Sequence, residues 1–182
     1  MSLADFARAE GRGGYLYELA KGVVVVVNVP RVSHGLLTQA IDDQVRVYKV
    51  AHPGVIHFLA PGSDCALRLP GLQSERHPDR ALYLTPPPSD NPWDAWTPEI
   101  AIEVVSRGQE ERDYGEKREE YLRAGVREYW IFDPHRRTAL FLRRQGDEWS
   151  EEEKEPASVY RTALLPGFEL DLAAVFTVAK DV

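Results

Sequence analysis

The chain has 182 residues, of which 43% are hydrophobic and 28% are charged, and its formal net charge is −7 at pH 7. This length and composition are typical of one globular domain with its own core, so we expect a single domain over residues 1–182. The only cysteine, Cys65, excludes an internal disulfide and any zinc or iron–sulfur site built from several cysteines. Any bound metal must then have oxygen or imidazole ligands.

The longest apolar run, Val23 to Val27, is too short to span a bilayer, and the acidic N-terminal segment lacks the apolar region of a secretory signal. We therefore expect a cytoplasmic protein without membrane contact. The negative charge argues against an extended nucleic-acid surface, which is normally basic. However, residues Glu148 to Glu155 include five glutamates, so much of the excess is one local acidic segment.

The first half of the chain predicts a hairpin, a helix and three short strands. Residues Tyr15 to Pro30 have β-branched and aromatic runs on either side of Ala-Lys-Gly, which is typical of two antiparallel strands, with Glu18 on the first. Apolar residues recur at helical spacing from Ser33, a candidate cap, to about Ala51. Segments with β propensity follow at Val55 to Leu59, Ala66 to Leu69 and Arg80 to Leu84.

The second half begins with Thr85 to Trp96, which has four prolines and is expected to be an irregular loop. A βαβ unit is then suggested by three segments. They are a strand buried on both faces at Glu99 to Val105, a charged helix at Glu110 to Ala124 that Gly125 ends, and another strand at Glu128 to Asp133. Arg137 to Arg143 predicts a further strand. Gly146 and Asp147 predict a turn, followed by a polar stretch and an apolar patch at Leu170 to Phe176.

Glu103 is the anomaly in this pattern, because an ionised carboxylate inside a strand core is costly unless it is paired or bound to a metal. Asp79 stands at the start of another predicted strand, so two adjacent strands would bring both carboxylates to one edge of a sheet. Magnesium is commonly held by one or two carboxylates together with waters and phosphate. Lys117, on the helix after the Glu103 strand, can return its ammonium group to this cleft to orient water or stabilise phosphoryl charge.

With these residues the chain resembles the Uma-two-type domains of the PD-(D/E)xK nuclease superfamily. The motifs, in the family's order, are YELAKG at 17–22, a helix begun by His34, HPD at 77–79, PEIAIEVVS at 98–106, RDYGEKREEY at 112–121 and AGVREYWIFDP at 124–134. Two places depart from the family pattern. His77 stands where glutamine is frequent, and Ser106-Arg107-Gly108-Gln109 replaces Ser-Pro-Ser-Thr.

The resemblance implies a restriction-endonuclease-like α/β fold, with a central mixed β-sheet flanked by helices and an N-terminal β-hairpin. It also implies that Asp79 and Glu103 bind Mg²⁺ or Mn²⁺, with the Val104 carbonyl as a third ligand, that Glu18 lies near the site, and that Lys117 is the catalytic lysine. In that scheme Glu18 assists a second ion or the water network. The activity to expect is metal-dependent hydrolysis of phosphodiester bonds, in DNA rather than RNA, by a homodimer.

Two other functions remain open from the sequence. The acidic charge and the altered segment after Ser106 favour a catalytically silent binding or assembly module with the same fold. Two carboxylates and a lysine can also serve a small-molecule hydrolase, whereas a basic stripe around Arg112, Lys117, Arg118 and Arg123 would favour nucleic acid.

Each candidate residue also has a purely structural interpretation. Glu103 can be half of a buried salt bridge, Asp79 can cap a turn, Lys117 can form an exposed ion pair with Asp113, and Glu18 can project into solvent. We expect no catalytic role for His34 or His77, with His34 facing solvent or capping a helix. Cys65 is expected to be a small core residue, and Trp93 and Trp96 either stack on bases or pack against a protein surface.

Overall fold

The computed structural model describes residues 1–13, 15–27, 31–90 and 92–178. Its centre is a six-stranded mixed sheet with the strand order β10-β9-β8-β7-β6-β3. The central pair β7 and β8 is parallel, and its other pairs are antiparallel. The strands are β3 (Phe58–Pro61), β6 (Arg80–Tyr83), β7 (Ile100–Val104), β8 (Glu128–Asp133), β9 (Thr138–Gln145) and β10 (Glu148–Lys154).

A smaller sheet with the order β2-β1-β5-β4 contains the N-terminal hairpin, and two short strands pair near the C-terminus. These strands are β1 (Leu16–Ala20), β2 (Val23–Val27), β4 (Leu67–Leu69), β5 (Ser74–Arg76), β11 (Val159–Tyr160) and β12 (Leu170–Asp171). The helices are α1 (Leu3–Phe6), α2 (Val32–Ala51), α3 (Lys117–Ala124) and α4 (Leu172–Thr177), with helical turns η1 (Gly62–Asp64) and η2 (Pro70–Leu72) and the π-helical segment η3 (Arg112–Glu116).

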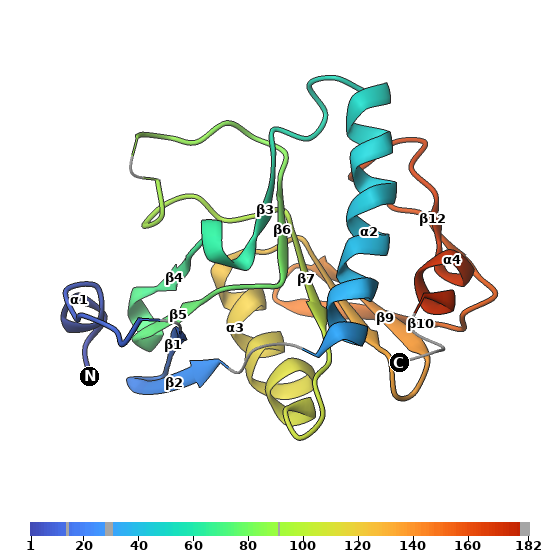
Figure 1. Ribbon diagram of the computed structural model, residues 1–182. Helices are drawn as coiled ribbons and strands as arrows, with labels where there is room; N and C mark the ends of the chain where they lie inside the picture. The colour runs from blue at the N-terminus through green and yellow to red at the C-terminus, as the bar shows by residue number, and fades with distance from the viewer. Residues whose placement is uncertain (14, 28–30, 91, 179–182) are drawn as a thin grey trace.

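The two faces of the central sheet are covered by different elements (Figure 1). On one face, α2 and α4 bury their apolar sides against Ile102, Trp130 and Phe141 and their neighbours. On the other face, α3 and β4 pack over Ala101, Tyr129 and Ile131. This burial explains why β7 and β8 are apolar on both sides, as strands in the middle of a covered sheet must be.

Local sequence signals predicted several elements correctly. The hairpin turns at Lys21 and Gly22, whose positive φ angles of 47° and 84° suit a tight turn, although residues 28–30 of the predicted segment lie outside the described residues. The predicted βαβ unit is β7, the helix over residues 110–124 and β8. That helix ends at Gly125, which adopts a left-handed conformation with φ 91°.

Other predictions were wrong in detail. Ser33 is not the cap of α2: the N-cap is Arg31, which makes no side-chain capping bond, and the helix already begins at Val32. The strand predicted at Val55 begins at Phe58, because Pro53 and Gly54 form a turn in which the Val55 N–H donates to His52. Strand β5 was not predicted.

The longest element that the sequence did not predict is β10, which follows the turn at Gly146 and Asp147 and was expected only to be polar. It pairs with β9 along its whole length, from Glu148 opposite Gln145 to Lys154 opposite Ala139. Glutamate has low β propensity, but here the tight turn at Gly146 aligns an edge strand whose acidic side chains reach basic partners, as in the pairs Glu151 with Arg118 and Glu152 with Arg143.

Trp96, in the proline-rich loop, packs against its own protein. It is 8% exposed and lies against Tyr83, with 3.9 Å between ring centroids, and Trp93 is partly buried beside it. The described parts of this loop, residues 85–90 and 92–96, have no helix or strand. Cys65 is buried in the same cluster, as expected of a small core residue.

Candidate metal centre

The register between β6 and β7 brings Asp79 next to Glu103. Arg80 pairs with Ile102, and the antiparallel register, continued by one residue, sets Asp79 opposite Glu103. The Val104 N–H also donates to Asp79 Oδ2 over 2.8 Å, which fixes the end of β6 against β7. The two carboxylates expected to share a site therefore do lie at one edge of the central sheet.

Asp79 is oriented from a third element, the first turn of α2. The His34 Nε2 atom lies 3.0 Å from Asp79 Oδ2, and His34 is only 9% exposed, so the expectation that it faces solvent or caps the helix was wrong. Burial alone would raise the pKa of Asp79, but the hydrogen bond and charge of His34, together with Lys117 and the Val104 N–H, hold this pKa below its ordinary value. Among the described residues, no donor bonds to Asp79 Oδ1.

Glu103 is 2% exposed and accepts two hydrogen bonds or ion-pair contacts on one oxygen. The Tyr121 hydroxyl donates to Glu103 Oε1 over 2.5 Å, and Lys117 Nζ lies 2.9 Å from the same atom. Burial raises the pKa of Glu103 to about 8; Lys117 opposes this shift, and the negative charges of Asp79 and Asp113 add to it. No donor in the described part of the chain contacts Glu103 Oε2.

Lys117 is held between Glu103 and Asp113, with 3.0 Å from Nζ to Asp113 Oδ1. The i,i+4 pair with Asp113 foreseen from the sequence exists, but both side chains are buried rather than exposed. Burial disfavours the charged lysine, yet Glu103, Asp113, Glu18 and Asp79 outweigh it and raise the pKa of Lys117, so the ammonium form persists. Glu103 and Asp113 contact the Lys117 ammonium group directly, and Glu18 and Asp79 act on it through their charge.

Glu18 reaches the same region from β1 but is bound to arginine. Its Oε2 accepts from Arg76 at 3.2 Å and from Arg112 at 2.5 Å, and its Oε1 accepts from the His77 N–H at 3.2 Å. Burial raises the pKa of Glu18, whereas Lys117, Arg76 and Arg112 lower it and prevail. Glu18 is 2% exposed, so it does not project into solvent.

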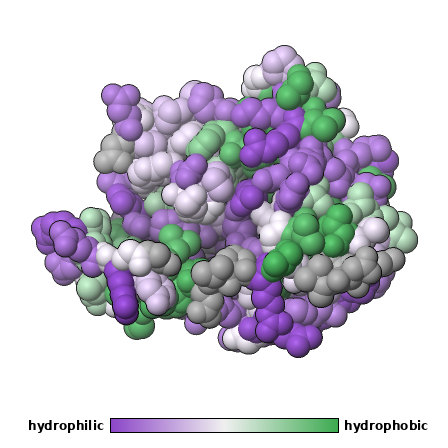
Figure 2. Space-filling view, viewed as in Figure 1, coloured by the Kyte–Doolittle hydropathy of each residue, from purple (hydrophilic) through white to green (hydrophobic). Residues whose placement is uncertain are grey.

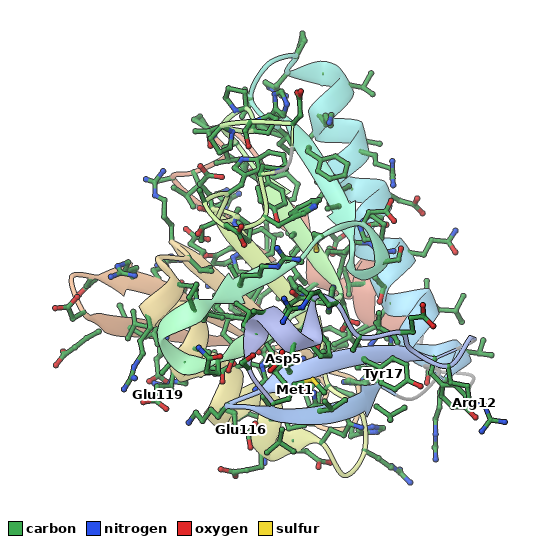
Figure 3. All side chains as sticks on the ribbon, turned by 90° about the vertical axis from the view of Figure 1, so that its left-hand side faces the viewer. Met1, Asp5, Arg12, Tyr17, Glu116 and Glu119 are labelled. Carbon is green, nitrogen blue, oxygen red and sulfur yellow. The ribbon has the colours of Figure 1, made fainter. Side chains whose placement is uncertain are left out.

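Arg76 of β5 joins Glu18 to the helical residues Glu116 of η3 and Glu120 of α3. It has no exposed surface and forms ion pairs with Glu120 at 2.6 Å and Glu116 at 3.3 Å as well as with Glu18. Figure 3 shows Glu116 and Glu119 on the same side of the molecule as Met1 and the N-terminal hairpin, and Lys21 of the hairpin pairs with Glu119. The hairpin, β5 and the helix are thereby fixed around Glu18.

These side chains line one cleft of about 650 Å³ between the hairpin, the start of α2 and the ends of β6 and β7. Asp79, Glu103, Lys117 and Glu18 all contribute to its wall, as do His34 and Asp113. Within the described ranges, no three histidine, cysteine, aspartate or glutamate side chains are arranged as a complete ligand set. A cation held here would therefore need backbone, water or substrate oxygens as additional ligands.

Residues 3–173 match the model of the Uma2 family, which is described as "Putative restriction endonuclease". The chain belongs to the Uma2 family. No curated protein matches it. Its fold is similar to that of the crystal structure of "a putative nuclease belonging to DUF820" from Anabaena variabilis ATCC 29413, with a TM-score of 0.78 and 17% identity over 98% of this chain and 99% of the other. The predicted restriction-endonuclease-like fold is thus confirmed.

Three residues of this Uma2 protein to which the sequence assigned no functional role contact the site residues: His34 contacts Asp79, Asp113 contacts Lys117, and Tyr121 contacts Glu103. Asp113, Lys117 and Tyr121 are spaced four residues apart, so one helix face presents an acid and a cation to the cleft and a hydroxyl to Glu103. That spacing was the available signal. His34 had none, because its partner Asp79 is 45 residues away in the sequence.

The basic stripe considered from the sequence of this Uma2 protein is already neutralised by its own acids. Arg118 pairs with Glu151, Arg123 with Glu119, and Lys117 is buried between carboxylates. Arg112 is bound to Glu18. This stripe therefore gives no support to nucleic-acid binding. No helix in the part of the chain that is described has the length and apolar character needed to cross a membrane.

Proposed function

We propose that this protein is a nuclease that uses Mg²⁺ or Mn²⁺ to hydrolyse phosphodiester bonds, with DNA as its substrate. One observation supports this most: Asp79 and Glu103 meet in a cleft, and each has one oxygen bonded by its neighbours and one oxygen that accepts no hydrogen bond from a described residue. A carboxylate so arranged is oriented by the protein and still has lone pairs for a cation. The donor set consists of hard oxygen atoms, which fits both metals.

Asp79 and Glu103 would hold the metal, and the Val104 carbonyl would be the third protein ligand. In a β-strand the N–H and C=O of one residue point to the same side, and the Val104 N–H donates to Asp79, so its carbonyl also faces that edge. When bound, the metal neutralises phosphate charge and lowers the pKa of water. Magnesium with two carboxylates commonly completes its shell with waters and substrate phosphate.

The remaining residues of the cleft position these groups. His34 and the Val104 N–H hold Asp79 Oδ2, and Tyr121 holds Glu103 Oε1. Lys117 supplies the positive charge that orients the attacking water and stabilises the developing negative charge on phosphate. Asp113 keeps the Lys117 ammonium group in the cleft when the metal competes with it for Glu103. Glu18, bound by Arg76 and Arg112, contributes negative charge beside the site rather than a free ligand oxygen.

The test is cleavage of supercoiled, linear and single-stranded DNA, and of RNA, by purified protein with Mn²⁺. We expect DNA to be cut and both Asp79→Ala and Glu103→Ala to abolish cutting. Arg161→Gln, an exposed residue paired with Glu169 away from the cleft, is the control that should retain activity. If no substrate is cut, the enzymatic proposal fails.

A catalytically silent binding or assembly module is the second candidate, and the ion pairs of the cleft favour it. Lys117 contacts Glu103 and Asp113 and two arginines contact Glu18, so the buried acidic groups have partners without a metal. Calorimetric titration with Mn²⁺ separates the candidates: the nuclease site should bind the ion and lose it on Glu103→Gln, whereas absence of heat at millimolar metal favours the module. We also propose a homodimer, which light scattering on the purified protein checks.

A further inference from the structure

The cleft contains two arginines that differ from its other basic residues. Arg80 is bound to Asp42, Arg112 to Glu18, and Lys117 to Glu103 and Asp113. Arg31 and Arg107 also line the cleft, both are exposed, and no described carboxylate lies within ion-pair distance of either. In a protein with 29 acidic and 22 basic residues, two arginines without an ion-pair partner among the described residues stand out in the lining of one cleft.

The positions of these arginines frame the carboxylates. Arg31 immediately precedes α2, three residues before His34, which contacts Asp79. Arg107 lies three residues after Val104, in the loop at the C-terminal end of β7. Asp79 and Glu103 lie at this same end of β7, so each arginine is joined by a short segment to one side of the site. In Figure 2 the face that carries the hairpin and α2 has much hydrophilic surface, with hydrophobic patches where valines of the hairpin and of α2 are exposed.

Neutral donors accompany the two arginines around the opening. Ser33 and Ser106 line the cleft next to Arg31 and Arg107 respectively, and His135 lines it from the loop after β8. The C-terminal ends of the parallel strands β7 and β8 lie side by side, which sets Arg107 and His135 on adjacent loops. Arginine, serine and histidine are typical contacts of phosphate oxygens and of the sugar–phosphate backbone in general.

We propose that Arg31 and Arg107 form an arginine rim that binds the sugar–phosphate backbone of a nucleic acid on both sides of the cleft. This inference rests on the proposed function, because it sets one phosphate of the strand next to Asp79 and Glu103. The rim supplies the attraction that the whole protein, with its net negative charge, does not. It contacts backbone and not base edges, so it gives affinity without sequence preference.

Fluorescence anisotropy measures this directly, with labelled single-stranded DNA, duplex DNA and RNA of about 20 nucleotides and Ca²⁺ in place of Mn²⁺. Each lost phosphate contact removes about 0.9 from the slope of log affinity against log salt for duplex DNA and about 0.7 for single strands. The double variant Arg31→Gln/Arg107→Gln should bind about tenfold or more weakly than wild type near 0.1 M salt, with a slope smaller by about 1.8 on duplex or 1.4 on single strands.

The matched control is Arg123→Gln/Arg161→Gln, which removes the same charge from side chains that are 57% and 64% exposed and lie outside the cleft lining. It should keep wild-type affinity and slope. Thermal melting shows whether both double variants fold. Equal loss in the two double variants, no loss in either, or no binding by the wild type overturns the rim.

The outcome is independent of cleavage. Rim-dependent binding without any Mn²⁺-dependent cutting would support the rim and refute the nuclease. Cutting of DNA by a rim variant with unchanged affinity and salt slope would support the nuclease and refute the rim. The three probes also identify which nucleic acid the rim holds best.

Discussion

Metal binding at this cleft should release a proton, because Glu103 must lose one to become a ligand. Its pKa of about 8 means that the metal-free carboxyl group is almost fully protonated at pH 6.5 and about half protonated at pH 8. The metal competes with that proton, so its apparent affinity is reduced by a factor of about 30 at pH 6.5 and about 2 at pH 8. The affinity for Mn²⁺ should therefore rise roughly 15-fold between these pH values.

Isothermal titration calorimetry in buffers of different ionisation enthalpy measures both quantities. Protons released per bound Mn²⁺ should fall from about one at pH 6.5 to about one half at pH 8. Glu103→Gln is the control: its amide retains the size of the side chain and an acceptor for Tyr121 but offers no carboxylate to the ion and has no proton to lose, so it should show neither Mn²⁺ binding nor proton release. Binding by the wild type that is independent of pH and releases no proton would refute the reasoning, because it would mean that Glu103 is already ionised in the metal-free cleft.

Four further predictions follow from the same contacts. Folding raises the pKa of Glu103, so between about pH 4.5 and 8 the folded metal-free protein keeps a proton on Glu103 that the unfolded chain has lost. Its free energy of unfolding should therefore fall as pH rises through this range. Urea titrations in EDTA should show this loss for the wild type and not for Glu103→Gln. Above about pH 8, where Glu103 is ionised, Lys117→Met leaves both Glu103 and Asp113 without their cation and should destabilise the metal-free protein by about 3–5 kcal/mol, so an unchanged urea midpoint there would contradict the ion-pair account. His34→Ala removes the contact that orients Asp79 and should weaken Mn²⁺ binding about 10–100-fold, measured by calorimetry, whereas equal affinity would show that Asp79 needs no such support. Glu128→Ala leaves three buried donors without their acceptor: Trp130 Nε1, the Tyr160 hydroxyl and the Thr162 hydroxyl. The free energy of unfolding, measured by urea or heat, should fall by about 3 kcal/mol, and the Mn²⁺ affinity should not change.

The elements that the sequence predicted well are those whose signals are local. The spacing of apolar residues marks α2, the continuous apolar runs mark β7 and β8, and Gly125 ends its helix by adopting a positive φ angle. Strand β10 was missed for the opposite reason. Its glutamates have no intrinsic preference for a strand, and they are held in one by pairing with β9 and by contacts with Arg118 and Arg143.

The sequence by itself determined that two carboxylates belong to buried strands: Glu103 lies within an apolar run, and Asp79 stands at the start of another strand. Its motifs also indicated the family and hence the fold. The tertiary structure alone decided which oxygens remain free. Charges that are far apart along the chain come together for three reasons. Strand β6 pairs with β7, α2 packs against them, and the helix that carries Asp113 and Lys117 turns both side chains toward the same place. The physical reason is that a hydrogen bond or ion pair acts over about 3 Å, whereas sequence patterns report only on neighbours within a few turns or strand residues.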